Sequence, residues 1–496
     1  MNKKQFQQFA AQGYNRIPVY KEILSDLDTP LTLFMKLANR PYSYLLESVQ
    51  GGEQWARYSM IGLSCANRLE IRGHNVREIE AGEVVNEQTL DDPLGFIDTV
   101  MARYRVPEVV DGLPHFMGGL VGYFAYDVVR LIEPSLEAYA AHQTDTLGVP
   151  DVVLLRSEEV VVVDNLSGKA YLILMTEPSE AAYQSAQSRL NELLRELEKT
   201  LSQTPLSLNH DNVAADKHFS TSADKFRADI DKCKDYIVDG DAFQIVLSQR
   251  MRTDFDGDPL DLYRVLRTLN PSPYMYYLHL DDFHIVGASP EILVRYENGE
   301  AQVRPIAGTR PRGQTPAEDL TLEKELLADP KECAEHLMLI DLGRNDIGRI
   351  AKAGCVEVTE QMVIERYSHV MHIVSDVVGQ VQDGKTAMDV FKAVFPAGTL
   401  SGAPKIRAMQ IISELEPVKR NIYGGAIGYL SWNGDMDTAI TIRTAVIKNG
   451  KLHVQAGAGV VYDSVAEDEW QETLNKAASV LTAQRLIDRS YTNPQK

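Results

Sequence analysis

VVLLRSEEVVVVDNLSGKAYLILM, residues 152–175, is the stretch that decides the fold. Its apolar runs are short, rich in valine and separated by charged residues, which is typical of β-strands. The Ser-Gly pair at 167–168 indicates a hairpin turn into the last run. The stretch therefore predicts two strands, a tight turn and a third strand.

The C-terminal half contains further strand-like runs. They alternate with helical segments but not in strict β–α–β order, which favours an α+β fold with antiparallel sheets. A doubly wound nucleotide-binding fold is disfavoured, because no GxxxxGK[ST] loop occurs and no GxGxxG lies between a strand and a helix. The runs are FQIVLSQRM (243–251), MYYLHL (275–280), FHIVGAS (283–289), ILVRYE (292–297), TAITIRTAVI (438–447) and KLHVQAGAGVV (451–461).

The clearest domain boundary lies near residues 201–220. An amphipathic helix with apolar residues spaced by three and four ends there, and SQTPLSLNHDNVAADKH (202–218) has no such periodicity. A new helix is predicted to open at Thr221, with a capping pair to Asp224. We therefore expect an N-terminal region at 1–200, a linker at 201–220 and a C-terminal region at 221–490.

Composition excludes several classes of protein. The chain has 496 residues and a formal net charge of −20, which disfavours binding to nucleic acids and anionic membranes. No apolar run approaches the roughly 18 residues of a membrane span, and no apolar signal segment follows the N-terminal lysines. The four cysteines form no CxxC pair, which indicates reduced thiols. We expect a soluble cytoplasmic protein.

Two acidic segments carry candidate chemistry. DPKECAEHLMLIDLGRND (329–346) places Glu332 and Glu335 on one helical face. SVAEDEWQETLNKAASV (464–480) begins with the capping pair Ser464 and Glu467, and it carries glutamates at 469 and 472 with Lys476. Solvated helix faces are one interpretation. Two carboxylates from separate elements are also what Mg²⁺ accepts, so a metal site is the alternative.

Three glycine-containing loops lie near predicted strand ends: PIAGTRPRG (305–313), FPAGTLSGAPK (395–405) and QAGAGVV (455–461). In the last loop, Gly457 and Gly459 allow a ligand to approach the backbone closely, before a helix start that favours anions. Arg443 and Lys476 add two cations that could hold carboxylates. Each loop by itself is also compatible with a plain turn.

Taken in order, these segments resemble the chorismate-utilising enzymes over roughly residues 220–485. The resemblance rests on PIAGTRPRG, AEHLMLIDLGRNDIGR, RYSHVMHIVS, FPAGTLSGAPK, YGGAIGYL, TAITIRTAV, QAGAGVVYDS and EWQETLNKA. Within the family, LLES (45–48), ARYSMIG (56–62) and NPSPYMYYL (270–278) are similar to the large subunits of anthranilate synthases. The resemblance implies two α/β subdomains around packed, mainly antiparallel sheets.

Two positions separate the branches of this family. Members that add water have a lysine where Gln244 stands, and a glutamine amide cannot deprotonate water. Aminodeoxychorismate synthases have a lysine where Ala307 stands, and a methyl group cannot attack the ring. The pair indicates addition of ammonia to C2 of chorismate. An enzyme that stops at 2-amino-4-deoxyisochorismate, an aminodeoxychorismate synthase and a catalytically silent tryptophan-binding subunit remain alternatives.

The resemblance also implies the site residues of a synthase that forms anthranilate and pyruvate. Glu291 matches the general acid, His372 matches a histidine associated with pyruvate loss, and Glu335 with Glu472 matches the Mg²⁺ site. The implied chorismate-binding residues are Gly308, Thr309, Tyr423, Arg443, Gly457, Ala458, Gly459 and Lys476.

Regulation and a partner are implied as well. Five residues match a tryptophan inhibitor site, namely Glu47, Ser48, Pro273, Tyr274 and Met275. None of the four cysteine contexts has the glycines of a nucleophile elbow, so the chain is not expected to release ammonia from glutamine. A separate glutamine amidotransferase subunit is expected, in a heterotetramer of two large and two small subunits.

Overall fold

The computed structural model describes residues 1–49, 57–201, 205–211, 214–367 and 370–487. Ala56 of the ARYSMIG motif and residues 368–369 of RYSHVMHIVS lie outside these ranges, as do parts of the predicted linker and residues 488–490. In the described part of the chain, no helix is long and apolar enough to span a membrane.

The described strands form two sheets of 12 strands each, and every pairing between named strands is antiparallel. The first sheet has the order β1 (Ile17–Leu24), β10 (Lys169–Thr176), β9 (Glu159–Asp164), β3 (Tyr58–Gly62), β2 (Ser43–Glu47), β13 (Tyr274–His279), β14 (Phe283–Ser289), β23 (Thr444–Lys448), β24 (Lys451–Val460), β12 (Gln244–Asp254) and β11 (His218–Phe219), with β20 (Gly402–Ala403) beside β12.

The second sheet has the order β17 (Ile306–Pro311), β19 (Val370–Val381), β16 (Glu300–Val303), β15 (Ile292–Glu297), β22 (Met436–Ile440), β21 (Ala426–Ser431), β7 (Gly119–Phe124), β8 (Val152–Ser157), β4 (Arg68–Arg72), β5 (Asn75–Glu80) and β6 (Glu83–Thr89), with β18 (Ala351–Arg366) beside β19. Both sheets take strands from both sides of residues 201–220. The division of the chain into an N-terminal region, a linker and a C-terminal region stays a prediction.

The three strands predicted at 152–175 are confirmed, and they are shared between the two sheets. β8 belongs to the second sheet, while β9 and β10 form an antiparallel hairpin in the first, with Asp164 opposite Lys169. The four consecutive valines of β9 do not alternate with polar residues, because both faces of the strand are covered. Val160 and Val162 belong to the core between the sheets, and Val161 and Val163 to the core beneath the outer helices.

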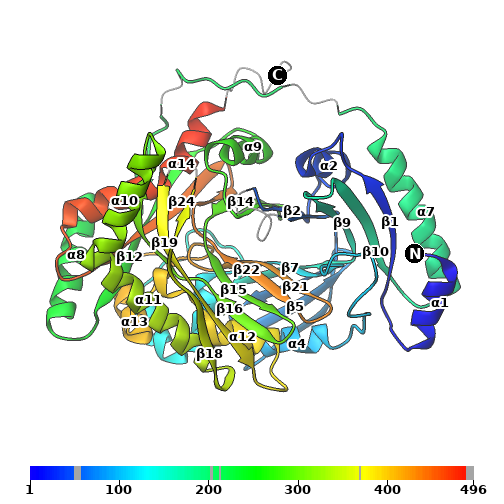
Figure 1. Ribbon diagram of the computed structural model, residues 1–496, viewed down its shortest axis with the longest axis horizontal. Helices are drawn as coiled ribbons and strands as arrows, with labels where there is room; N and C mark the ends of the chain where they lie inside the picture. The colour runs from blue at the N-terminus through cyan, green and yellow to red at the C-terminus, as the bar shows by residue number, and fades with distance from the viewer. Residues whose placement is uncertain (50–56, 202–204, 212–213, 368–369, 488–496) are drawn as a thin grey trace.

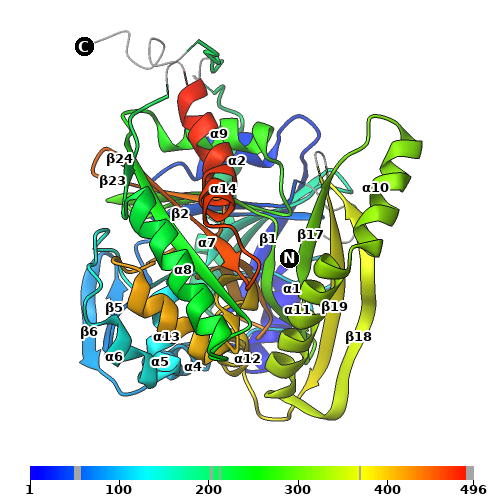
Figure 2. The ribbon, with the colours of Figure 1, turned by 90° about the vertical axis from the view of Figure 1, so that its left-hand side faces the viewer.

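Helices cover the outer faces of the two packed sheets (Figure 1). Against the first sheet lie α1 (Lys3–Ala11), α2 (Pro30–Leu37), α7 (Glu180–Leu197), α9 (Pro259–Leu269) and α14 (Ala466–Leu486). Against the second lie α4 (Gly95–Met101), α11 (Pro330–Gly348) and α12 (Ala387–Val394). The remaining helices are α5 (Val129–Ile132), α6 (Glu137–Ala140), α8 (Ala223–Val238), α10 (Pro316–Ala328) and α13 (Lys405–Leu415), together with the 3₁₀ turns η1 (Tyr126–Val128), η2 (Pro134–Leu136) and η3 (Gly398–Leu400). Figure 2 shows α8 and α13 on one side and α10 and α11 on the other.

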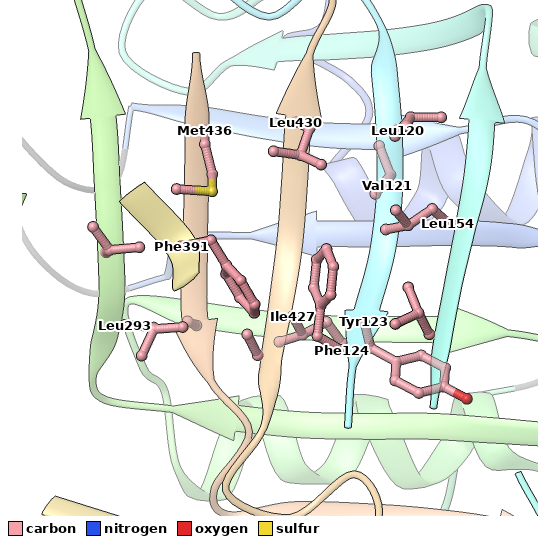
Figure 3. Close-up of a cluster of buried hydrophobic side chains, with 14 of the residues drawn as sticks. Leu120, Val121, Tyr123, Phe124, Leu154, Leu293, Phe391, Ile427, Leu430 and Met436 are labelled. Carbon is pink, nitrogen blue, oxygen red and sulfur yellow. The ribbon is translucent and has the colours of Figure 1, made fainter. Parts of the chain in front are cut away.

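The core on the second sheet is built from aromatic and aliphatic side chains (Figure 3). Phe391 of α12 is fully buried, and its ring lies 4.4 Å from that of Phe124 on β7. Met436, Ile427 and Leu430 of the neighbouring strands belong to the same core. This packing fixes α12 against the sheet, and the segment that follows α12 leads into the candidate site.

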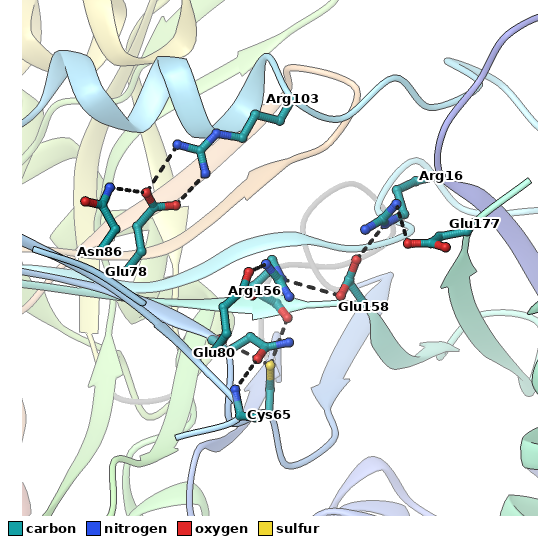
Figure 4. Close-up of polar contacts among 11 residues, drawn as sticks. Arg16, Cys65, Glu78, Glu80, Asn86, Arg103, Arg156, Glu158 and Glu177 are labelled. Atoms are coloured by element: carbon teal, nitrogen blue, oxygen red, sulfur yellow. Dashed lines mark hydrogen bonds and ion pairs between the residues drawn. The ribbon is translucent and has the colours of Figure 1, made fainter. Parts of the chain in front are cut away.

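Ion pairs hold the opposite edge of the second sheet (Figure 4). Arg156 of β8 donates to Glu80 of β5 at 2.8 Å and lies 3.5 Å from Glu158, which also pairs with Arg16 at 2.9 Å. These partly exposed pairs tie the connection between β8 and β9 to the N-terminal segment. Each contributes little to stability, in the range of about 0–1 kcal/mol.

Candidate active site

A cavity of about 520 Å³ lies at the end of the molecule formed by β12 and β24 of the first sheet and β17 and β19 of the second. Helices α11 and α14 provide two further walls, and η3 closes the inner end. Long-range strand pairing builds this arrangement. Gln244 is the first residue of β12. The next two residues, Ile245 and Val246, pair with Val460 and Gly459 of β24.

The cavity gathers almost all the residues that the sequence analysis assigned to catalysis, chorismate and metal. Its lining includes Gln244, Glu291, Ala307, Gly308, Thr309, Glu335, His372, Tyr423, Arg443, Gly457, Gly459, Glu472 and Lys476. Ala458 is the exception: its side chain is fully buried, and only its two glycine neighbours line the cavity.

Glu291 follows β14 and projects into the cavity near two cations. Burial raises the pKa of the Glu291 carboxyl, while a hydrogen bond from Thr399 and the charges of Arg443 and Lys476 act in the opposite direction. The Thr399 hydroxyl donates to Glu291 Oε2 at 3.0 Å. A carboxyl whose pKa is raised in this way keeps its proton to higher pH and can act as a general acid.

Four glutamates from two helices face the cavity, namely Glu332 and Glu335 of α11 and Glu469 and Glu472 of α14. Glu335 Oε1 accepts a hydrogen bond from Gln244 Nε2 at 2.9 Å, and Glu472 pairs with Lys476. Burial raises the pKa of Glu469 and of Glu332. Lys476 also donates to the Gly457 carbonyl at 3.0 Å, which connects α14 to β24.

The arrangement of these carboxylates can be compared with what a Mg²⁺ site requires. Among the described residues, no group of three or more His, Cys, Asp or Glu side chains is arranged as a preformed metal cage. Mg²⁺ does not require one, because it keeps several waters and binds through one or two carboxylates. Glu335 and Glu472 come from different helices and face one cavity, so their donor set fits a partly hydrated Mg²⁺ ion.

The two glycines of β24 leave room for neighbouring side chains. A Cβ at Gly457 would lie 2.8 Å from Tyr423 Oη, and a Cβ at Gly459 would lie 2.8 Å from Gln244 Nε2. Any other residue would therefore displace a side chain that lines the cavity. This is the physical reason for the QAGAGVV pattern.

His372 of β19 is held in one tautomer. Its Nδ1 lies 2.9 Å from the Gly308 carbonyl oxygen and 3.1 Å from Thr309 Oγ1. Because a carbonyl can only accept, Nδ1 carries the hydrogen and Nε2 keeps its lone pair. Burial lowers the pKa of His372, so the ring is neutral near pH 7 and Nε2 can act as a base.

Arg443 occupies a strained backbone position at the edge of the cavity, with φ of 53°. Burial lowers the pKa of its guanidinium, and the nearby carboxyls of Glu291 and Glu472 raise it. Its side chain makes no hydrogen bond or ion pair with the described residues. A partly buried guanidinium that makes no direct hydrogen bond or ion pair with a described side chain is well suited to bind a carboxylate of a ligand.

Comparison with known proteins agrees with this geometry. Residues 44–482 match the family described as chorismate binding enzymes. The chain belongs to this family. It is 55% identical over 495 residues to anthranilate synthase component 1 of Pseudomonas aeruginosa, covering 99% of this chain and 100% of that protein.

Two solved structures share the fold. Anthranilate synthase component I from Streptococcus pneumoniae superposes with a TM-score of 0.76 at 39% identity, covering 92% of this chain and 99% of that one. The menaquinone-specific isochorismate synthase of Escherichia coli, at 19% identity, has a TM-score of 0.70 over 97% of this chain and 99% of its own. The predicted fold class, with helices around two antiparallel sheets, is therefore confirmed.

A second, smaller cavity of about 80 Å³ lies between the two sheets. All five residues of the predicted inhibitor site line it: Glu47, Ser48, Pro273, Tyr274 and Met275. Glu47 and Met275 are register partners on β2 and β13. The opposite wall comes from the second sheet, through β15, β21 and β22. The Ser48 hydroxyl is buried and has no hydrogen-bond partner within the described structure.

Sequence reasoning missed several lining residues. Lys331, Thr399, Ser464 and Glu469 face the main cavity, but none of them was included among the predicted catalytic, substrate-binding or metal residues. Thr399 lies in the FPAGTLSGAPK loop, where the glycines drew attention and the hydroxyl did not. Lys331 lies one helical turn before Glu335, and Glu469 lies one helical turn before Glu472. Helical spacing did single out Glu469, three residues before Glu472, but it was not included among the predicted site residues.

Proposed function

We propose that this chain is the chorismate-converting subunit of an anthranilate synthase. It would add ammonia to C2 of chorismate and release pyruvate, the first step of tryptophan biosynthesis. The observation that carries the proposal is the position of Gln244 and Ala307 in the same cavity as Glu291. Neither side chain can deprotonate water or attack the ring, whereas ammonia has its own lone pair. The relatives named anthranilate synthase component 1 support the same reaction.

Chorismate carries two carboxylates, and the cavity offers two cations for them. Arg443 and Lys476 would bind these groups, with the Tyr423 hydroxyl and the backbone around Gly457 and Gly459 fixing their orientation. Gly308 and Thr309 would form the opposite wall. Glu335 and Glu472 would hold Mg²⁺, which supplies Lewis-acid neutralisation of a substrate carboxylate.

In the first step, Glu291 acts as the general acid. As the C–N bond forms at C2, the C1=C2 and C5=C6 double bonds move to C1=C6 and C4=C5, the C4–O bond breaks, and Glu291 donates its proton so that the hydroxyl leaves as water. The ammonium group formed at C2 then loses one proton to solvent and becomes the amine. The addition product is 2-amino-4-deoxyisochorismate. The raised pKa of Glu291 supports this role, since an ionised carboxylate has no proton to give.

The second step requires a base. Removal of the C2 proton and cleavage of the C3–O bond release enolpyruvate, which takes a proton at its methylene carbon and becomes pyruvate, while the ring becomes aromatic. Neutral His372 with its lone pair on Nε2 supports an assignment as this base. Replacing His372 with Asn should then leave the addition step and slow aromatisation.

Regulation and assembly complete the proposal. We infer that tryptophan binds in the 80 Å³ cavity between the sheets and shifts them to a state of low chorismate affinity. The name component 1 implies a second component, which we propose to be a glutamine amidotransferase that supplies ammonia in a cytoplasmic heterotetramer of two large and two small subunits.

The test uses the purified chain alone with chorismate, an ammonium salt at alkaline pH and Mg²⁺, followed by anthranilate fluorescence. Fluorescence that requires Mg²⁺, is lost with EDTA and is suppressed by tryptophan is the expected result. Consumption of chorismate without fluorescence would mean that the enzyme stops at 2-amino-4-deoxyisochorismate or makes aminodeoxychorismate, and product analysis distinguishes the two. Tryptophan binding without consumption would favour a silent regulatory subunit.

A further inference from the structure

The backbone of Glu291 is fixed by its neighbours. Its carbonyl accepts hydrogen bonds from the Ile440 amide at 3.0 Å and from Ser289 Oγ at 3.3 Å, and its own amide donates to Ser289 Oγ at 3.3 Å. These contacts lock the start of β15 against β22. They leave the position of the carboxyl group to be set by side-chain contacts alone.

Glu291 is shared between two neighbouring cavities. Glu291 lines both the 520 Å³ cavity and a neighbouring one of about 50 Å³, which is lined largely by apolar side chains such as Leu293 and Leu342. A rotation of the Glu291 side chain toward this small cavity would move the carboxyl away from the main cavity. Something must therefore hold it toward the main cavity.

Thr399 is placed to do so, because it also lines both cavities and donates from Oγ1 to Glu291 Oε2 at 3.0 Å. We propose that Thr399 is the positioning residue for the general acid, a role that rests on the proposed anthranilate synthase reaction. With Oε2 accepting from Thr399, this arrangement assigns the acidic proton to Oε1, the oxygen that the threonine does not engage. The threonine thus fixes both the direction of the carboxyl and the oxygen that delivers the proton.

The 3₁₀ turn that carries Thr399 is rigidly anchored. The Leu400 carbonyl accepts from Arg420 at 2.6 Å, and Arg420 is fully buried and paired with Glu416 at 2.7 Å. On the other side, Lys405 donates to the Val394 carbonyl at 2.8 Å, at the end of α12. A hydroxyl carried by a turn whose flanking backbone is anchored on both sides can define one geometry for its partner.

The hydrogen bond also predicts a signature that a structural role lacks. Donation from Thr399 stabilises the ionised carboxylate and lowers the pKa of Glu291 against the effect of burial. Thr399→Val keeps the volume and removes the hydroxyl. The Glu291 pKa should then rise while turnover falls, so the alkaline limb of the kcat profile moves to higher pH.

The experiment compares wild type, Thr399→Val, Thr399→Ser, Glu291→Gln and the double variant at constant free ammonia. We expect Thr399→Val to lower kcat at least about tenfold, with KM for chorismate within about twofold of wild type, and Thr399→Ser to restore most of the activity. The double variant should be no slower than Glu291→Gln, because Thr399 acts through Glu291. A rise in KM with unchanged kcat, or additive losses, would overturn the proposal.

An infrared titration separates this proposal from the proposed reaction. The band of the protonated carboxyl that disappears in Glu291→Gln should titrate at higher pH in Thr399→Val than in wild type or Thr399→Ser. This result does not depend on turnover. If the wild type made no anthranilate but the band still shifted, the proposed function would fail and the hydrogen bond would stand. An unshifted band would refute the positioning role.

Discussion

Glu47 and Arg267 form a partly buried ion pair at the predicted inhibitor cavity, with the guanidinium donating to both carboxylate oxygens at 3.0 and 3.1 Å. The Tyr263 hydroxyl also donates to Glu47, at 2.5 Å. Arg267 and Tyr263 both lie on α9, which packs against α14, the helix that carries Glu472 and Lys476. The end of β2 is therefore physically linked to a wall of the main cavity, and a ligand ammonium at Glu47 would join a carboxylate that already has a cationic partner.

Removing Arg267 should weaken both stability and inhibition. Glu47 is 4% exposed, and Arg267→Met would leave its charge without a cation. We expect a loss of about 2 kcal/mol, less than for a fully buried pair because the Arg267 side chain is 31% exposed. Urea unfolding and tryptophan inhibition curves measure the two effects. Arg264→Met on the same helix, where Arg264 pairs with Asp261, is the control.

Ser48→Phe should abolish inhibition by tryptophan and leave ammonia-dependent turnover within about twofold. The phenyl ring would fill the 80 Å³ cavity between the sheets, which shares no lining residue with the main cavity. The measurement is anthranilate formation over a range of tryptophan concentrations, with Ser48→Ala as a variant that leaves the cavity open. A Phe variant with full sensitivity would contradict the inhibitor-site assignment.

Glu472→Ala should lower Mg²⁺-dependent turnover by at least about 100-fold, because the variant would lose a ligand of the metal ion. The matched control is Glu467→Ala, because Glu467 lies on the same helix but pairs with Arg227 at 2.8 Å and does not line the cavity. Mg²⁺ titration by calorimetry provides a readout besides activity. Undiminished Mg²⁺ binding in Glu472→Ala would rule out this ligand.

Gln244→Lys should lower anthranilate formation at least about tenfold. In the wild type, the Glu335 carboxylate accepts a hydrogen bond from the neutral Gln244 amide at 2.9 Å. The lysine ammonium would lie beside this carboxylate and would compete with a metal ion for it. Gln244→Met keeps the volume and separates the lost hydrogen bond from the added charge. Anthranilate fluorescence with chromatography for isochorismate gives the result, and equal losses in both variants would mean that charge has no part in the effect.

His336 should make the protein sensitive to acid. Its ring is fully buried, its Nε2 lies 2.7 Å from Ser375 Oγ, and burial lowers its pKa to about 4 from 6.5. The unfolded chain therefore binds a proton at a pH where the folded chain does not. The free energy of unfolding should fall by up to about 3 kcal/mol as pH drops from 6.5 toward 4. Urea unfolding across this range should show a smaller slope in His336→Gln, whereas the exposed His142→Gln should match wild type.

Local patterns predicted strands better than helix ends. The helix expected at Thr221 begins at Ala223, and Ser222 is its N-cap, because its hydroxyl accepts from the Lys225 amide at 3.2 Å. The capping pair of Ser464 and Glu467 is also wrong: Ser464 Oγ accepts from the Val461 amide at 3.0 Å, and α14 starts without a side-chain cap. Adjacent Ser and Thr residues offer equivalent caps, and only the backbone geometry chooses between them.

The sequence by itself determined the elements and the chemistry of this protein. Apolar runs and turn residues set the strands, and the amide of Gln244 with the methyl of Ala307 predicts the class of nucleophile, because these properties belong to single residues and their near neighbours. Tertiary structure alone decided that β8 and β9, one residue apart, enter different sheets, and that Thr399 meets Glu291. Such contacts depend on strand order and register across the whole chain, which local propensity does not encode.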